Sequence, residues 1–349
     1  MHVDSSLVHS SFADGTAPTR GSEIRDQGGL LDTPAEDSEM DLLRIAHLFH
    51  VEELSKVEIG QRMGISRFKV TRSLRRAREL GLVRVELASP LANMVRLETE
   101  LAGTFGLQQA VVSPAPQDTD PNVLREKIGS VAAEYLYKQV RHGEVVGVTW
   151  GRTLSRAVLD MRTDPQRRVT VVELMGGSGY LPKDFDTLGV APRLAEKLGG
   201  RCFYLPVPAI VETAQMRDAF LQDKTVRQTI DMFQQITTAA MGVGVVGEDL
   251  APYQAGLLSA QDLVRLAAQG AVCNVGGRFY AQDGQMVVGV FDERINAIEH
   301  AQLSKVPRRI VVAGGPHKIQ ALLATIHAGL CTVLITDEAT AAALIAGGR

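Results

Sequence analysis

The spacing of apolar side chains divides the chain into segments of different character. Residues 1–40 are rich in Ser, Gly, Asp and Thr and show no sustained period. We therefore expect a disordered leader over residues 1–39. Over residues 41–51, Leu42 and Ile45 begin an apolar stripe with the period of a helix, so the first helix is predicted there.

Two more helices are predicted from the residues at their ends. Ser55, followed three residues later by Glu58, forms a capping box, in which each side chain bonds the backbone N–H of the other residue. Gly64 can end that helix, and Ser66 can cap a further helix that runs to Leu80. Two helices joined by a turn that contains glycine are typical of a helix-turn-helix motif.

The sequence after the third helix predicts a strand and then a connecting helix. Apolar and polar residues alternate over 82–87, which is typical of a half-buried strand. Helix, turn, helix and strand in this order predict a winged helix-turn-helix domain over residues 40–89. Apolar residues recur at helical spacing within residues 90–106, so this helix packs on the rest of the chain or on a second subunit.

One face of the third helix is cationic. Val70, Leu74 and Ala77 lie close together on a helical projection, and we expect them to face the core of the domain. The rest of that helix supplies the residues predicted to contact DNA: Ser66, Arg67, Phe68, Lys69, Thr71, Arg72, Arg75 and Arg76. A solvated basic helix is the alternative, but the capping box, the glycine turn and the strand favour DNA.

From residue 107 onward, strands alternate with helices. The predicted strands lie at 110–112, 145–148, 169–174, 203–205, 236–243, 310–313 and 332–335, and the predicted helices at 121–142, 153–161, 187–198, 317–328 and 337–346. Apolar strands with helical crossovers are typical of a parallel sheet covered on both faces. The predicted fold class is α/β: an N-terminal all-α or winged helix-turn-helix domain, followed by a Rossmann-like doubly wound parallel sheet over residues 107–349.

Three loops after predicted strands are rich in glycine. The first contains Gly147, Thr149, Gly151, Arg152 and Thr153, the second Gly176 and Gly177, and the third ends at Lys318. Ligands of open α/β sheets gather at the carboxyl ends of strands, and free N–H groups at a helix start suit phosphate. The loops therefore predict an anion site, although the first loop alone is equally well explained as a tight turn.

Charge is distributed unevenly along the chain. The whole chain has a net charge of −3, but residues 1–40 hold 2 basic and 8 acidic side chains. Residues 41–90 hold 10 basic and 6 acidic side chains. A basic segment of this kind is a candidate for binding nucleic acid.

Other functions lack a signature in the sequence. No apolar run is long enough to span a membrane, so no membrane partner is predicted. Cys202, Cys273 and Cys331 lie far apart, which fits a reducing cytoplasm. We predict no metal, no catalytic residue and no cofactor, because the glycines of 242–247 match a dinucleotide fingerprint by letter but not in context.

Four segments in this order resemble the SorC family of bacterial sugar-binding transcriptional regulators: 54–70, 147–154, 312–318 and 334–341. The resemblance implies an effector domain similar to sugar-phosphate isomerases but without their catalytic set. It also implies a phosphorylated sugar or polyol effector, with its phosphate on residues 147–153 and Lys318 beside it. The partner would be double-stranded operator DNA, bound by a homodimer or homotetramer.

One position departs from the family pattern. The family often has Gly-Asp where this chain has Cys273 and Asn274, so Asn274 is predicted to be a neutral effector contact. The leading alternative function is a sugar-phosphate isomerase or deaminase with an appended DNA-binding module, and a plain oligomeric scaffold is a third. No acid/base pair can be identified, which argues against the enzyme.

Overall fold

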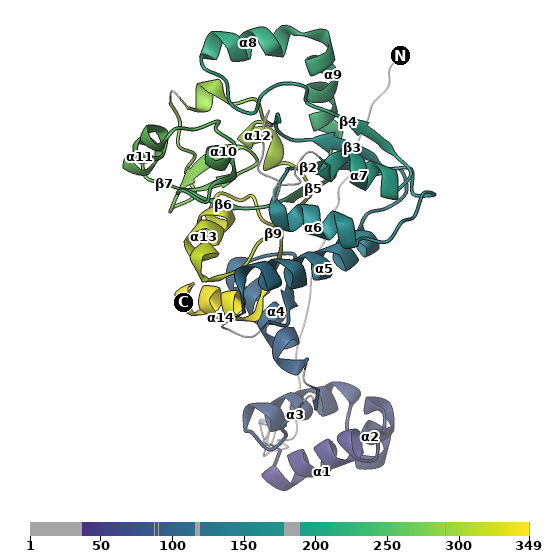
Figure 1. Ribbon diagram of the computed structural model, residues 1–349. Helices are drawn as coiled ribbons and strands as arrows, with labels where there is room; N and C mark the ends of the chain where they lie inside the picture. Colours follow the sequence, from purple (N-terminus) through teal and green to yellow (C-terminus); the bar gives the residue numbers. More distant parts are fainter. Residues whose placement is uncertain are drawn as a thin grey trace, which may run out of the picture. The chain divides into compact units, whose positions relative to one another are not determined.

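The computed structural model describes residues 37–86, 88–89, 91–115, 119–177, 189–289 and 291–348 (Figure 1). The chain forms two compact units, with the division after residue 87. Nearly all of the predicted leader lies outside the described residues. Its last residues belong to unit 1, because Ser38 caps the first helix with its side chain.

Unit 1 is a small domain of three helices: α1 (Glu39–His50), α2 (Lys56–Met63) and α3 (Arg67–Glu79). The predicted capping box of Ser55 and Glu58 is confirmed, with both of its hydrogen bonds formed. Gly64 ends α2 at a φ of +67°, and Ser66 caps α3. These local signals therefore place α2 and α3 as the sequence predicts.

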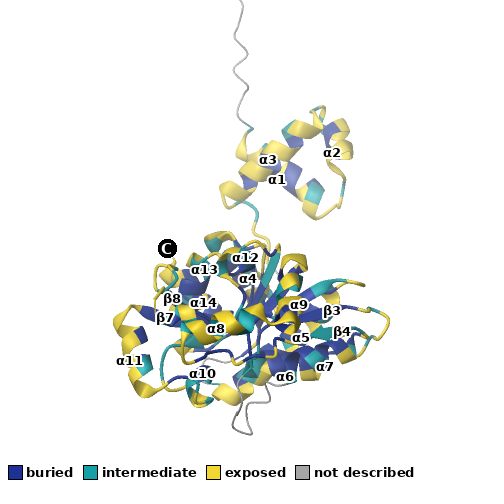
Figure 2. Cartoon of the chain, turned by 90° about the horizontal axis from the view of Figure 1, so that it is seen from above, coloured by how far each residue is buried: buried dark blue, intermediate teal, exposed yellow. Residues whose placement is uncertain are grey.

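A compact apolar core holds the three helices together (Figure 2). It consists of Leu42, Ile45, Ala46, Leu48, Ile59, Val70, Leu74 and Ala77. The predicted inner face of α3 is thus confirmed. Close packing of the turn also needs Gly60, because a Cβ there would lie 2.7 Å from the carbonyl oxygen of Ile65.

The strand predicted over 82–87 is wrong for residues 82–86, which are irregular. Leu82 and Val83 still pack against the core of unit 1, which accounts for their apolar character. A strand needs a neighbour to pair its backbone groups, and the described part of unit 1 supplies no second strand. Leu87 lies outside the described residues.

Unit 2 is built on a seven-stranded sheet. In spatial order its strands are β1 (Gln109–Ser113), β10 (Val333–Asp337), β9 (Arg308–Val312), β5 (Thr238–Met241), β2 (Val145–Val148), β3 (Thr170–Glu173) and β4 (Arg201–Phe203). All neighbouring strands are parallel. The predicted parallel sheet is therefore confirmed.

Helices cover both faces of this sheet (Figure 1). One face packs against α5 (Pro121–Gln139), α6 (Arg152–Asp160) and α7 (Val190–Lys197). The other packs against α4 (Ala92–Phe105), α9 (Lys224–Met232), α13 (Ile319–His327) and α14 (Glu338–Gly347). Alternate strand residues, such as Val171 and Val172, enter the two cores, so the doubly wound arrangement is confirmed.

A second sheet was not predicted. It is antiparallel and consists of β6 (Gly244–Val245), β7 (Ala271–Val275) and β8 (Arg278–Ala281), with α10 (Ala251–Gln254) and α11 (Ala260–Ala268) nearby. The remaining helices are α8 (Ala214–Gln222), α12 (His300–Leu303) and the 3-10 turns η1 (Phe233–Gln235), η2 (Asp292–Arg294) and η3 (Pro316–Lys318). Asn274, predicted as an effector contact, lies in β7, one residue before its end.

The connecting helix α4 packs on its own chain. Met94, Leu97 and Leu101 are buried in the core that also contains α13 and α14. Of the two alternatives left by the sequence, packing on the rest of the chain is the one observed. The buried face of α4 is therefore not available to a second subunit.

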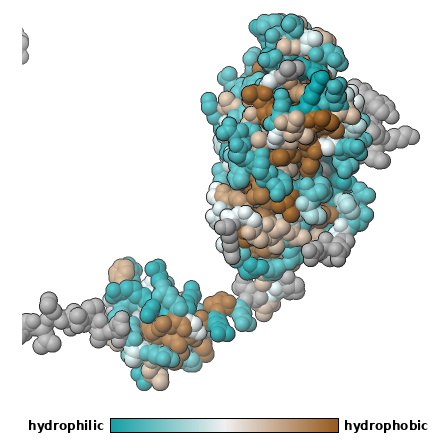
Figure 3. Space-filling view, turned by 90° about the vertical axis from the view of Figure 1, so that its left-hand side faces the viewer, coloured by the Kyte–Doolittle hydropathy of each residue, from teal (hydrophilic) through white to brown (hydrophobic). Residues whose placement is uncertain are grey.

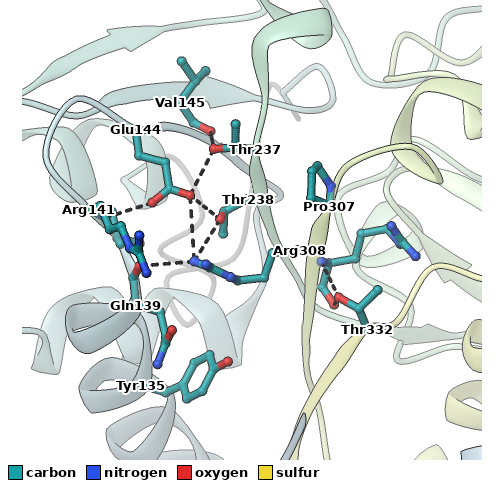
Figure 4. A network of polar contacts seen from close by, with 12 residues as sticks. Tyr135, Gln139, Arg141, Glu144, Val145, Thr237, Thr238, Pro307, Arg308 and Thr332 are labelled. Atoms are coloured by element: carbon teal, nitrogen blue, oxygen red, sulfur yellow. Dashed lines mark hydrogen bonds and ion pairs between the residues drawn. The ribbon is translucent and has the colours of Figure 1, made fainter. Parts of the chain in front are cut away.

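A polar network closes the amino edge of the main sheet (Figure 4). Glu144, just before β2, accepts hydrogen bonds from the hydroxyls of Thr237 at 3.0 Å and Thr238 at 2.5 Å. Arg308, at the start of β9, lies 3.8 Å from the same carboxylate and donates to the carbonyl oxygen of Gln139 at 3.1 Å. The cation at this edge is matched by a carboxylate and by neutral acceptors.

The surface view shows hydrophobic side chains gathered on part of one face of unit 2, amid hydrophilic ones (Figure 3). Among the described residues, no helix has the length and apolar character needed to cross a membrane.

Candidate functional site

The carboxyl edge of the main sheet opens into a cavity of about 260 Å³. It lies where β2 and β5 are neighbours: from β2 the chain continues to β3 and β4 on one side, and β5 begins the other half. Ligands of doubly wound sheets bind at such a switch point. Thr149, after β2, and Gly242, after β5, meet here, with the Gly242 N–H donating to the threonine hydroxyl at 3.4 Å.

The cavity brings together six of the predicted effector contacts from separate parts of the sequence: Thr149, Gly151, Arg152, Thr153, Asn274 and Lys318. They come from the loop after β2, the start of α6, the strand β7 and the turn η3. Gly147, Gly176 and Gly177 are not part of its wall.

Gly147 and Gly176, both predicted as effector contacts, lie outside the cavity wall and are packed closely against their neighbours. A Cβ at Gly147 would lie 2.6 Å from a methyl of Leu174, and a Cβ at Gly176 would lie 2.4 Å from the carbonyl oxygen of Val207. Gly151 differs from both, because no atom lies within 4 Å of the position its Cβ would take. Of these three glycines, Gly151 is the one that leaves its backbone open to the cavity.

Helix α6 begins at the cavity wall. Its N-cap residue, Gly151, has no side chain and so supplies no cap to the first-turn N–H groups. Thr153 in the first turn and Thr149 just before it add hydroxyl donors. A helix start of this kind is suited to an anion.

Three cations converge on the cavity: Lys318, Arg152 and Arg125. Lys318 is largely enclosed, and its Nζ donates to the carbonyl oxygen of Val243 at 2.8 Å. Burial, and then the charges of Arg152 and Arg125, lower the pKa of Lys318 to about 8, against the opposing effect of Asp249. Like charges brought together out of water raise the free energy of the empty site.

The sequence analysis missed Arg125. It lies on α5, where its Nη1 donates to the side-chain oxygen of Asn122 at 2.7 Å. Burial, and then the charge of Arg152, lower the pKa of Arg125. Because α5 packs beside α6, Arg125 reaches the same cavity as Arg152, although it lies 27 positions earlier in the chain. The position of Arg125 near the start of a helix that follows β1 is the sequence feature that could have identified it as a site residue.

Neutral and acidic groups complete the wall. Asp249, from the loop before α10, and Asn274, from β7, both line the cavity. The Asn274 side chain donates to the carbonyl oxygen of Arg278 at 3.3 Å, which fixes its orientation. Burial, and then the charge of Lys318, lower the pKa of His317, which favours the neutral imidazole. Such groups can exchange hydrogen bonds with sugar hydroxyls.

Trp150 also lines the cavity and is the single tryptophan of the chain. Its ring N–H donates to the carbonyl oxygen of Gly176 at 3.0 Å. Its indole therefore provides a built-in optical probe of the cavity.

The loop from β9 to η3 is held by a buried carboxylate. Asp337, at the end of β10, accepts from the Gly315 N–H at 2.8 Å and from the Thr340 N–H at 2.9 Å. These bonds fix Gly315, whose φ is +99°, and with it the turn that carries Lys318. The described residues contain no group of three His, Cys, Asp or Glu side chains that could hold a metal ion.

Helix α3 exposes most of the side chains predicted to contact DNA. Those fully on the surface are Ser66, Arg67, Phe68, Thr71, Arg72, Arg75 and Arg76. Two hydroxyls are engaged locally: Ser66 accepts from the Lys69 N–H at 3.2 Å, and Thr71 donates to the carbonyl oxygen of Arg67 at 3.0 Å. Lys69 is partly buried and lies 3.0 Å from Asp37.

Known proteins resemble this chain over most of its length. Residues 89–346 match the Sugar-bind family model, a sugar-binding domain. The chain is 31% identical over 309 residues to the uncharacterized transcriptional regulator YjhU of Escherichia coli, covering 87% of this chain and 94% of that protein. It is 30% identical over 309 residues to the erythritol catabolism regulatory protein EryD of Brucella abortus, covering 87% and 95%.

A solved full-length structure is also similar. The sorbitol operon regulator SorC from Klebsiella pneumoniae superposes with a TM-score of 0.69 at 25% identity, covering 88% of this chain and 99% of that one. The chain therefore belongs to the SorC family of sugar-binding transcriptional regulators.

Proposed function

We propose that this chain is a DNA-binding regulator of carbohydrate or polyol catabolism, acting in the cytoplasm, whose operator affinity a phosphorylated sugar or polyol controls. One observation carries the proposal. Arg125, Arg152 and Lys318 meet at the open start of α6, in a cavity at the switch point of the sheet. A bound phosphate offsets the repulsion between these cations and accepts hydrogen bonds from the helix start.

The rest of the cavity suits the carbon chain of such an effector. Asp249 accepts hydrogen bonds from hydroxyls, and Asn274 and Thr149 can donate as well as accept. With about 260 Å³, the cavity has room for a small phosphorylated sugar or polyol. The neutral Asn274 supports an effector whose hydroxyls do not require a second carboxylate.

The proposed DNA contact is the exposed face of α3. Arg72 lies opposite the buried Val70 and Leu74 and is exposed, so its side chain points away from the core of unit 1. A symmetric operator requires two such helices, and a homodimer or homotetramer supplies them. Because the apolar face of α4 is already buried, the subunit contact in this proposal lies on another surface.

The effector proposal is tested by titration followed through Trp150 fluorescence. A panel of sugar and polyol phosphates is compared with the same compounds lacking phosphate, and only phosphorylated members are expected to bind tightly. Gly151→Val serves as the blocked variant, because its side chain would enter open cavity space without a clash. Equal binding of phosphorylated and unphosphorylated compounds would overturn the phosphate assignment, and turnover of any panel member would favour the enzyme.

The DNA proposal is tested by gel shifts across operator variants. Arg72→Ala is expected to weaken binding by about 1–3 kcal/mol and to relax specificity at one base pair. Arg76→Ala is expected to weaken all sequences alike. Arg44→Ala, an exposed arginine of α1, is the matched control and should bind as the wild type does. If both α3 variants also bind normally, α3 is not the recognition helix.

A further inference from the structure

The cationic face of α3 already holds an acidic side chain from its own chain. Asp37, just before α1, lies 3.0 Å from the Nζ of Lys69 and accepts a hydrogen bond from the hydroxyl of Ser73. Lys69 and Ser73 lie on consecutive turns of α3. The Asp37 carboxylate therefore contacts the side of the helix rather than its end. Asp37 is therefore a ligand of α3 supplied in the same molecule.

The environment of Asp37 is that of a bound anion. Although burial tends to raise it, hydrogen bonds from Ser73 and Lys69 hold the pKa of Asp37 below its usual range, and the charges of Lys69 and Arg72 act in the same direction. The side chain of Asp37 is 18% exposed and that of Lys69 is 39% exposed. Asp37 is the less exposed of the two, and an anion that takes its contacts with both Lys69 and Ser73 must displace it.

A DNA phosphate and this carboxylate seek the same kind of partner. Both are anions that accept charge-assisted hydrogen bonds from an ammonium and a hydroxyl. The sequence before Asp37 adds to the effect, since residues 1–36 hold six acidic and two basic side chains, a net charge of −4. These residues directly precede Asp37 in the sequence, so the charge of Asp37 is followed up the chain by further negative charge.

We infer that Asp37 occupies a phosphate-contact position on α3 and lowers the affinity of the chain for DNA of any sequence. The inference rests on the proposed DNA-binding function of α3. When DNA binds, Lys69 exchanges Asp37 for a phosphate, so the loss of the Asp37 contact offsets part of the free energy gained from the new one. Because a phosphate contact carries no sequence information, this cost is the same at every site, and it lowers the amount of non-specific DNA that the chain occupies.

The experiment uses the full chain and a random-sequence duplex of about 30 base pairs, with binding measured by fluorescence anisotropy from low to physiological salt. Asp37→Asn keeps an oxygen for Ser73 but removes the charge. We expect about two- to fivefold tighter binding at low salt. The slope of log affinity against log salt should also become steeper, because salt screens the repulsion between Asp37 and DNA, which the variant lacks.

Glu39→Gln is the matched control. It makes the same charge change two residues along the chain, on an exposed side chain in the first turn of α1. It should leave affinity and slope unchanged, and in a Lys69→Gln background the gain from Asp37→Asn should vanish. Thermal melting of each variant establishes that the domain stays folded.

The outcomes separate this inference from the function on which it rests. Weaker or unchanged binding by Asp37→Asn, or an equal gain from Glu39→Gln, overturns the competition. Absence of DNA binding by the wild type and by every variant overturns the proposed function instead.

Discussion

The two edges of the main sheet hold their cations in opposite ways. At the amino edge, Arg308 is paired with Glu144 and donates to neutral oxygens, including the hydroxyl of Thr238 at 3.3 Å. Each group in that network finds a partner within the fold. The network joins the starts of β2, β5 and β9, and it stabilises the sheet.

At the carboxyl edge the cations repel one another. Arg152 and Arg125 both lower the pKa of Lys318, and Arg152 lowers the pKa of Arg125 after burial has done so. A fold that only needed stability would not bring these charges together out of water. The comparison teaches that an arginine with its partner in the fold indicates structure, whereas like charges beside an open helix start indicate a ligand.

The largest expected effect is at the amino edge. Glu144→Ala leaves Arg308 and two threonine hydroxyls without their acceptor, so it should lower the free energy of unfolding by about 3 kcal/mol. Urea denaturation of unit 2 measures this loss. Glu134→Ala, which removes an exposed glutamate of α5, is the control and should cost less than about 0.5 kcal/mol. Similar losses in the two variants would break the comparison.

The second effect is at the carboxyl edge, where we expect a loss of ligand binding rather than a loss of stability. Lys318→Met should weaken binding of the phosphorylated effector by about 100-fold, the equivalent of one charge-assisted contact. Stability should stay level or rise, because a repelling cation has been removed. Trp150 fluorescence measures the first quantity and urea denaturation the second. Lys305→Met, at an exposed site, is the control, and a large loss of stability in Lys318→Met would give Lys318 a structural role.

The pH dependence sharpens the same contrast. The pKa of Lys318 is lowered from 10.5 to about 8, and a bound phosphate raises it again, so binding takes up a proton above pH 8. Affinity should therefore be level from pH 7 to 8 and then fall, by about tenfold per pH unit at most. Lys318→Met should lack this fall. An affinity that stays level to pH 9.5 in the wild type would exclude Lys318 from the phosphate contact.

The smallest effect concerns Arg125, which is less enclosed than Lys318. Arg125→Met should weaken effector binding by about fivefold, consistent with a partly solvated ion pair. Lys127→Met, on the exposed side of α5, removes the same charge away from the cavity and should leave binding intact. Equal effects of the two variants would reduce the role of Arg125 to general electrostatic attraction.

Local signals made much of this fold predictable. The capping box at Ser55 depends on residues three positions apart, and the apolar strands depend on neighbours in sequence. The signals failed where pairing decides the structure. Residues 82–86 alternate as a strand does but have no strand to pair with in the described part of unit 1. In contrast, no strand is predicted over the residues of β7, which pairs antiparallel with β6 and β8.

The cavity was predictable in part for the same reason. Thr149, Gly151 and Lys318 follow strands, so their meeting at one edge follows from a parallel sheet. Arg125 reaches the site only through the packing of α5 on α6, and the missing Cβ of Gly147 serves the core. Residues nearby in the sequence predict neither which two helices will pack together nor whether the Cβ position of a glycine will face the core or the cavity.

The buried carboxylate at the end of β10 has a mechanical consequence. Asp337 holds Gly315 in the cavity wall, and its neighbour Glu338 accepts a hydrogen bond from Asn93 in the first turn of α4. The two acidic residues are consecutive, so the cavity wall and the beginning of α4 are anchored on a single rigid turn. The wall of the cavity and the first turn of α4, the first helix of unit 2, are thus linked through two hydrogen bonds and the peptide bond between Asp337 and Glu338.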